Sequence, residues 1–358
     1  MARKRDEFLE KHSLRDRVGK LEKELAKAHE ASDELNAIKE IVGSLGERVS
    51  KLQPVTWLSD PKPAMTSAPG IPTLFLSDLH WSEQVFPGQI GGVNRYDLAI
   101  AADRMQYTVE TAIYLLRIIS PEMQYPGIVA VLGGDMLSGN IHDELTATNQ
   151  KNIMPSVLDL YDRLCAAIIK LADTFGRVFL PCVSGNHGRD TRKTWAKDRN
   201  ATSFDWLVYQ FLSVHFKDDK RIVFYIPDGS DALYRVYNTR YNLTHGDQFK
   251  AGDSIIGPIG PLTRGNQKKQ ARNQAINQEY DILLAGHWHQ YIHLERLIVN
   301  GSMKGYDEYA YQGNFGFEPP RQALWLTHPR YGVTYRMPVL CEQPKKGPPV
   351  ADWITVPK

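Results

Sequence analysis

Cysteine is scarce in this chain of 358 residues. Cys165, Cys182 and Cys341 are the three that occur, and they lie far apart. Cys165 and Cys182 have apolar neighbours, so we interpret them as small core residues. An odd number of widely separated cysteines does not suit a disulfide framework, and the sequence therefore favours a reducing compartment.

Long apolar runs are missing as well. No stretch approaches the roughly 20 apolar residues that cross a bilayer, and the N-terminal MARKRDEFLEKHSLRDRVGKLEKEL lacks the apolar core of a signal peptide. Charge is nearly balanced, because 43 Lys and Arg oppose 41 Asp and Glu for a net charge of +2. This balance excludes a strongly basic nucleic-acid coat but permits a locally basic site. We expect a cytoplasmic protein that has no membrane partner.

Composition divides the chain into four segments. Within residues 1–52, apolar or small residues recur at spacings of three and four, with charged residues between them. This pattern predicts an N-terminal coiled-coil helix that makes the protein a homo-oligomer, although a single helix folded back on the main domain is the alternative. Proline-rich segments predict a linker at 53–70 and a tail at 341–358. Residues 71–340 form the predicted main domain.

Short β-rich runs alternate with helix-like segments in the main domain. The predicted strands lie in TLFLSD, GIVAVLGGD, RVFLPCVSGNH, RIVFYIP, LYRVY, YNLTHGD and DILLAGHWH, and the predicted helices near 95–119, 153–175 and 203–216. Strand–helix alternation followed by denser strands indicates an α/β domain in which helices cover mixed sheets.

Five of the predicted strands end in side chains that commonly bind metals. In α/β sheets, sites form at the carboxyl ends of strands, so residues far apart in sequence can converge there. Mixed carboxylate, amide and imidazole ligation suits Mn²⁺, Fe or Zn²⁺ better than Ca²⁺ or a thiolate zinc site. The seven candidate ligands are Asp78, His80, Asp135, Asn186, His245, His287 and His289.

Seven donors are too many for one tetrahedral ion. They suffice for two divalent ions if one carboxylate bridges them and water completes the coordination. Two ions about 3.5–4 Å apart clamp a phosphoryl group and turn a bridging water into a hydroxide nucleophile near neutral pH. The sequence therefore predicts in-line hydrolysis of a phosphate ester. We expect Mn²⁺ because the ligands are rich in oxygen and nitrogen, with Zn²⁺ or Fe as alternatives.

The order of these motifs resembles that of a known family. Asp-x-His, Gly-Asp, Gly-Asn-His, His and Gly-His-x-His occur in turn between residues 73 and 289, as in the calcineurin-like metallophosphoesterase superfamily. Each motif alone is weak, but the ordered set is specific. The resemblance implies a sandwich of two mixed β-sheets flanked by helices.

The resemblance also implies a role for each candidate residue. The first metal would be held by Asp78, His80 and His289, and the second by Asn186, His245 and His287, with Asp135 bridging them. His187 would contact the phosphate and protonate the leaving oxygen, a task that suits imidazole near neutral pH.

The chain departs from the family pattern after Gly-Asn-His. Many members continue with Asp or Glu, whereas Gly188 and Arg189 follow here. What orients His187 is therefore open, with the neighbours of the Gly-Asp motif and His142 as candidates. We expect Gly185 and Gly188 to let the backbone turn sharply beside the metals.

Two further features bear on the subfamily. Asn140, five residues after Asp135, is loosely similar to the corresponding motif of SbcD-like DNA nucleases. Small phosphoesterases with a leading helical segment are also typical of phage genomes, and this chain is similar to them in that respect.

Basic segments flank the candidate site. GRDTRKTWAKDR follows His187 and TRGNQKKQARNQ follows His245, and cationic loops beside two metals suit DNA or a nucleotide. We expect Arg189 and Arg192 to bind the substrate. The sequence thus favours a phosphodiesterase or DNA nuclease over a nucleotide or small-molecule phosphomonoesterase. A non-catalytic coiled-coil scaffold is less favoured, because a scaffold gains nothing from seven ligands.

Overall fold

The computed structural model describes residues 69–250 and 257–343. The predicted coiled coil at 1–52, nearly all of the linker at 53–70, and the tail from residue 344 onward lie outside these ranges and stay predictions. Among the helices within the described ranges, none combines the length and the apolar character needed to cross a bilayer.

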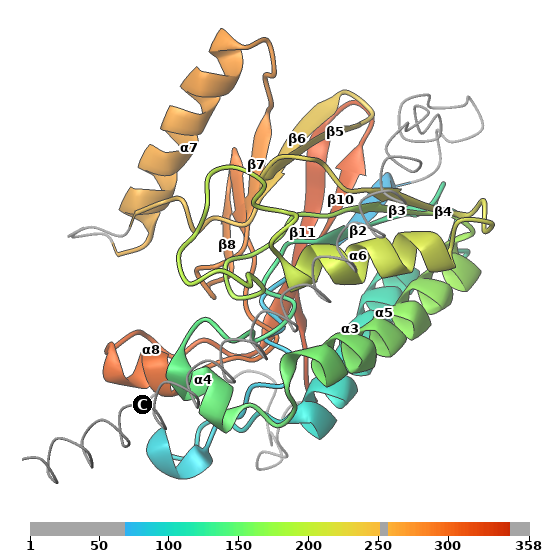
Figure 1. The fold of residues 1–358 in the computed structure, drawn as a ribbon. Coiled ribbons are helices and arrows are strands. Elements are labelled where there is room, and N and C mark those ends of the chain that lie inside the picture. The colour runs from blue at the N-terminus through green and yellow to red at the C-terminus, as the bar shows by residue number, and fades with distance from the viewer. Residues whose placement is uncertain (1–68, 251–256, 344–358) are drawn as a thin grey trace, which may run out of the picture. The chain divides into compact units, whose positions relative to one another are not determined.

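The described strands form two mixed sheets (Figure 1). The first has the order β11-β10-β1-β2-β3-β4. Its strands β1 to β4 run parallel to one another, whereas β10 pairs antiparallel with β1 and β11 pairs antiparallel with β10. The second has the order β5-β6-β7-β9-β8, in which β6, β7 and β9 run parallel. The first sheet's strands are β1 (Ile71–Leu76), β2 (Ile128–Leu132), β3 (Val178–Pro181), β4 (Ile222–Tyr225), β10 (Arg321–His328) and β11 (Gly332–Leu340). Those of the second are β5 (Asp231–Val236), β6 (Thr239–Thr244), β7 (Ile282–Ala285), β8 (Ile292–Leu294) and β9 (Leu297–Val299).

The parallel strands are apolar on both faces because both faces are covered. Every residue of β1, β2, β3 and β7 is buried, which is why these strands appear in the sequence as continuous apolar runs. Side chains from both sheets interdigitate in one core, which includes Phe75, Val131, Tyr241, Leu284 and Trp325. The predicted arrangement of two mixed sheets with flanking helices is confirmed.

Three long helices cover the outer face of the first sheet (Figure 1). They are α3 (Leu98–Ile119), α5 (Ile153–Phe175) and α6 (Phe204–His215), and α5 packs between the other two. Asp97 accepts a hydrogen bond from the backbone N–H of Ile100 and so caps α3, and Gly176 ends α5 in a left-handed conformation. These helices match the three that the sequence predicts to within three residues.

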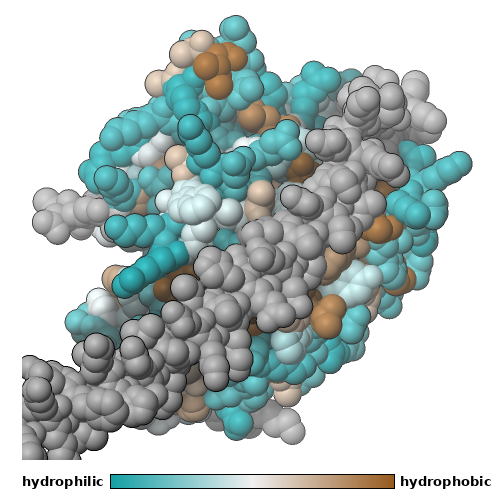
Figure 2. Space-filling view, in the orientation of Figure 1, coloured by the Kyte–Doolittle hydropathy of each residue, from teal (hydrophilic) through white to brown (hydrophobic). Residues whose placement is uncertain are grey.

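One long helix was not predicted. α7 (Ile259–Ala275) covers the outer face of the second sheet, and the positions of its buried stripe include Leu262, Asn266, Lys269 and Asn273. Because three of these four side chains are polar, the sequence carries no apolar helical period there. Hydrophilic residues dominate the coloured surface over this helix (Figure 2). The remaining short elements, η2 (Pro87–Gln89), α4 (Asp143–Thr148) and α8 (Glu308–Gln312), lie in connecting loops.

Because side chains pack closely between the sheets, truncating one of them should greatly lower the free energy of unfolding. Leu284 is fully buried between the layers, so Leu284→Ala should lower the free energy of unfolding by about 2–5 kcal/mol. Leu340→Ala is the matched control, because Leu340 is 44% exposed, and it should change stability by about 0.5 kcal/mol or less. Urea denaturation measures both, and equal costs would contradict this packing.

His293 predicts a pH dependence of stability. Its ring centroid lies 6.1 Å from that of Trp325, and burial lowers its pKa to about 4. In the unfolded chain histidine titrates near 6.5. Between those values the unfolded state binds a proton that the folded state does not, so stability falls as pH drops from about 6.5 to about 4. His293→Phe should therefore lose less stability than the wild type between about pH 7 and about pH 5 in urea denaturation. An identical loss would contradict the prediction.

Candidate metal centre

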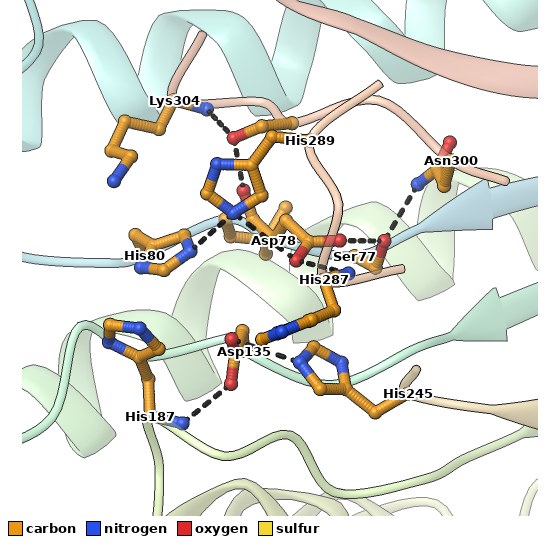
Figure 3. A network of polar contacts seen from close by, with 12 residues as sticks. Ser77, Asp78, His80, Asp135, His187, His245, His287, His289, Asn300 and Lys304 are labelled. Atoms are coloured by element: carbon orange, nitrogen blue, oxygen red, sulfur yellow. Dashed lines mark hydrogen bonds and ion pairs between the residues drawn. The ribbon is translucent and has the colours of Figure 1, made fainter. Parts of the chain in front are cut away.

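Five parallel strands from the two sheets direct their carboxyl ends to one place. The residues labelled in Figure 3 that follow these ends lie together there, although they are spread over more than half of the chain. Asp78 and His80 follow β1, Asp135 follows β2, Asn186 and His187 follow β3, His245 follows β6, and His287 and His289 follow β7. We call these eight residues the strand-end cluster.

The cluster contains groups of potential ligand atoms that lie within 4.8 Å of one another. Asp135 belongs to two of these groups, as expected of a carboxylate that two metal ions share. The groups are Asp78, His80 and His289; Asp135, His245 and His287; and His80, Asp135 and His187.

Short contacts hold the ligand atoms in position. Nε2 of His289 lies 3.0 Å from Nε2 of His80 and 3.4 Å from Oδ1 of Asp78. Nε2 of His245 lies 3.0 Å from Oδ2 of Asp135. The two carboxylates also accept backbone hydrogen bonds, Asp78 from His287 at 2.8 Å and Asp135 from His187 at 2.7 Å. Each carboxylate is thus fixed by the strand end that faces it.

Unusual backbone conformations occur at five of the seven candidate ligands. Asp78, His80, Asp135, His287 and His289 all have positive φ, between 47° and 68°. Residues other than glycine rarely adopt this conformation, although Asp and His do so more often than most, and it costs about 1–3 kcal/mol. The fold therefore accepts strain where it directs these side chains inward.

The buried carboxylates of the cluster favour positive charge beside them. Burial raises the pKa of Asp135, but His245 outweighs this effect and the pKa lies well below its usual value. Burial lowers the pKa of His245, but the Asp135 carboxylate raises it to about 10. Burial also lowers the pKa of His80 and of His287 to about 4, which keeps both imidazoles in the neutral, ligating form. A proton on His245 supplies positive charge that a divalent ion could equally supply.

Asn186 adds a further sign of a ligand site. Its Oδ1 atom is buried and has no hydrogen-bond partner among the described residues, although buried polar atoms are almost always paired. An amide oxygen in this state can bind a cation. Together with the carboxylates and neutral imidazoles, Asn186 makes a donor set that fits divalent metal ions.

Ser138 orients His187. Nδ1 of His187 lies 3.1 Å from the carbonyl oxygen of Ser138, three residues after Asp135. A carbonyl only accepts, so Nδ1 carries the proton and Nε2 is left for the substrate. The ring of His187 also packs edge-on against His80 and His142, with centroids 4.6 Å and 5.9 Å apart. A neighbour of the Gly-Asp motif therefore takes the place of the absent acidic residue.

The expected reason for Gly185 and Gly188 is wrong. Neither glycine has positive φ, and both are required for space instead. A Cβ at Gly185 would lie 2.0 Å from Oδ1 of Asp135, and one at Gly188 would lie 2.7 Å from Oδ1 of Asp205. Asp205, at the start of α6, is fully buried and accepts a hydrogen bond from the Gly185 backbone, and burial raises its pKa to about 7. No motif in the sequence singles out Asp205.

The predicted substrate-binding arginines differ in environment. The Arg189 guanidinium donates to the backbone carbonyls of Asn186, Thr191 and Arg192, so it braces its own loop. Its role in substrate binding stays a prediction that these contacts do not favour. Arg192 is exposed and its side chain has no hydrogen bond or ion pair with the residues that the structure describes. It remains available to an anion.

Acidic partners also occupy part of the basic segments. Arg199 forms two hydrogen bonds to Asp247, two residues after His245. On α7, Lys269 and Arg272 both pair with Asp231. These pairs leave fewer free cations beside the cluster than the sequence suggests.

A second layer of residues behind the cluster was not predicted. Asn300, which follows β9, donates to Ser77 and Gln322, and Ser77 donates to Oδ2 of Asp78 at 2.5 Å. Glu83 and Lys304, both buried, lie behind His80, and Figure 3 shows Lys304 beside His80. Asn300 directly follows the apolar triplet of β9, as the ligands follow their strands, but three residues are too few to predict a strand from the sequence.

Comparison with other proteins adds little to this geometry. No protein-family model matches the chain, and no characterised protein matches it significantly. The chain is similar in structure to a predicted phosphoesterase from Streptococcus pneumoniae TIGR4, with 11% identity, coverage of 72% of this chain and 84% of that one, and a TM-score of 0.28. It is also similar to vacuolar protein sorting 29 from Cryptosporidium parvum, with 13% identity, coverage of 72% of this chain and 84% of that one, and a TM-score of 0.28. For Vps29 complexed with Zn²⁺ from Entamoeba histolytica, the identity is 11%, the coverage is 75% of this chain and 99% of that one, and the TM-score is 0.30.

The close approach at Gly185 predicts a local effect of adding one methyl group. Gly185→Ala should push the Asp135 carboxylate away and lower the free energy of unfolding by about 1–3 kcal/mol. Gly229→Ala is the control, because a Cβ there would meet nothing within 4 Å, and it should leave stability the same or slightly higher. Urea denaturation of both variants checks this, and a stable Gly185→Ala protein would contradict it.

Proposed function

We propose that the chain is a dinuclear metal-dependent phosphoesterase, most favourably a phosphodiesterase that acts on DNA. The observation that carries the proposal is the pairing of two ligand groups around Asp135. Two divalent ions bound there would neutralise a phosphoryl group and supply a hydroxide nucleophile near neutral pH. Mn²⁺ is the proposed metal, and Zn²⁺ or Fe would satisfy the same donors.

The protein's own residues would divide the remaining work. Asp78, His80 and His289 would hold one ion, and Asn186, His245 and His287 the other. His187 would stand over the phosphate with Nδ1 held by Ser138. Burial lowers the pKa of His187, but an anionic ester bound beside it would favour the protonated ring. Protonated Nε2 would then donate its proton to the leaving oxygen.

The exposed cations beside the cluster support a nucleic-acid substrate. Arg192, Lys193 and Lys197 are exposed on the loop that follows His187, and Trp195, 55% exposed, lies between them in sequence. Cations with an exposed aromatic ring suit a phosphate backbone and a stacked base. The second candidate, a nucleotide or small-molecule phosphomonoesterase, is favoured by the ion pairs that occupy Arg199, Lys269 and Arg272.

Hydrolysis assays distinguish these substrates. Metal-stripped protein resupplied with Mn²⁺ should cleave labelled single- or double-stranded DNA faster than an aryl phosphomonoester. His187→Ala should lower the rate about 10²-fold or more. His215→Ala, on the exposed surface where α6 packs beside α5, is the matched control and should keep full activity.

Each other outcome has a clear meaning. Monoester turnover with intact DNA would favour the phosphomonoesterase. No turnover of any ester by metal-loaded protein would contradict the enzyme and leave the scaffold as the better hypothesis.

A further inference from the structure

Three charged side chains form a buried chain behind His80. Nζ of Lys304 lies 2.8 Å from Oε1 of Glu83 and 2.5 Å from Oδ2 of Asp307. The other oxygen of Glu83, Oε2, lies 3.2 Å from Nδ1 of His80. The side chains of Glu83, Lys304 and Asp307 are 8%, 4% and 7% exposed, so water contributes little to their solvation.

Stability alone does not explain three buried charges. Removing ions from water costs several kcal/mol each, and well-packed apolar side chains in their place are often neutral or stabilising. The chain is also directed toward the metal centre. Ser302 donates to the backbone carbonyl of Asp78 at 2.9 Å, so the segment that carries Lys304 is fixed to the same strand end as His80.

The order of the contacts determines which nitrogen of His80 is free. The negative carboxylate of Glu83, 3.2 Å from Nδ1 of His80, favours the tautomer with its proton on Nδ1, so that Nε2 keeps its lone pair. Nε2 is the nitrogen that faces His289, at 3.0 Å. The Lys304 ammonium balances the Glu83 charge, and Glu83 in turn raises the basicity of the imidazole as a ligand.

The other metal position is built differently. Nδ1 of His245 lies 2.9 Å from the backbone carbonyl of Gly133, a neutral acceptor. A buried carboxylate therefore supports His80, whereas a peptide carbonyl supports His245.

We propose that Glu83 and Lys304 are positioning residues for the metal ion held by Asp78, His80 and His289, and that they act selectively on this ion. The inference rests on the proposed dimetal function. Neither residue touches the substrate; both act through the orientation and tautomer of His80.

Metal binding tests this proposal without an activity assay. Metal-stripped full-length protein is titrated with Co²⁺ alone, followed by calorimetry and visible absorption. The wild type should bind two ions. Glu83→Gln keeps the shape of the side chain but removes its charge. It should lower the affinity for one ion by about 10- to 100-fold and leave the affinity for the other unchanged.

Two further variants separate positioning from folding. The triple variant Glu83→Gln, Lys304→Met, Asp307→Asn removes all three buried charges, so no unpaired ion is left to destabilise the core, and it should still bind one of the two ions more weakly. Tyr241→Phe removes a buried hydroxyl that bonds Thr327 and Trp325 in the sheet core, and it should bind both ions like the wild type.

Several results would overturn the proposal. It fails if Glu83→Gln binds both ions normally, if the affinity for both ions falls equally, or if the triple variant regains wild-type affinity. A wild type that binds fewer than two ions overturns this proposal together with the dimetal function. Selective weakening in a protein that hydrolyses no ester supports the positioning role and contradicts the function alone.

Discussion

Two carboxylates buried at the meeting point of the sheets are the constraint on which the rest of this structure depends. Asp78 and Asp135 are 0% and 1% exposed, and an ionised carboxylate without water or a partner is very costly. Every strand end that reaches them supplies compensation, through the backbone N–H groups of His187 and His287 and through imidazole rings. The two-layer architecture provides this directly, because parallel strands of both sheets end at the same edge.

Directing so many side chains to one point strains the surrounding backbone. Five of the candidate ligands adopt left-handed conformations, which residues other than glycine seldom adopt. Glycine is required where strand ends touch, as at Gly139, where a Cβ would lie 1.8 Å from the carbonyl oxygen of His187. Strain and close approach of this kind persist only when packing around the site holds the geometry, which the buried core between the sheets does.

The sequence predicts most of the fold because the central strands are buried on both faces. β1, β2, β3 and β7 are nearly continuous apolar runs, and each is followed within a few residues by a candidate ligand. The helix α7 could not be predicted in this way, because its buried stripe contains Asn266, Lys269 and Asn273. Such polar positions are explained only by partners distant in sequence, as Asp231 explains Lys269.

The same distinction applies to the candidate site. Ligand types follow strand ends within a few residues, so their convergence is predictable from local sequence and a rule about sheets. Glu83 and Lys304, which support His80, carry no such local signal, since a glutamate and a lysine in loops are ordinarily solvated.

The charged residues that the sequence does emphasise turn out to be partly neutralised, as Arg199 is by Asp247. Counting charges along the chain therefore overstates the positive field around the site, while it misses the buried charges that set the geometry of a ligand. The distinction between these two kinds of charge is burial, and burial is a property of the fold rather than of any segment.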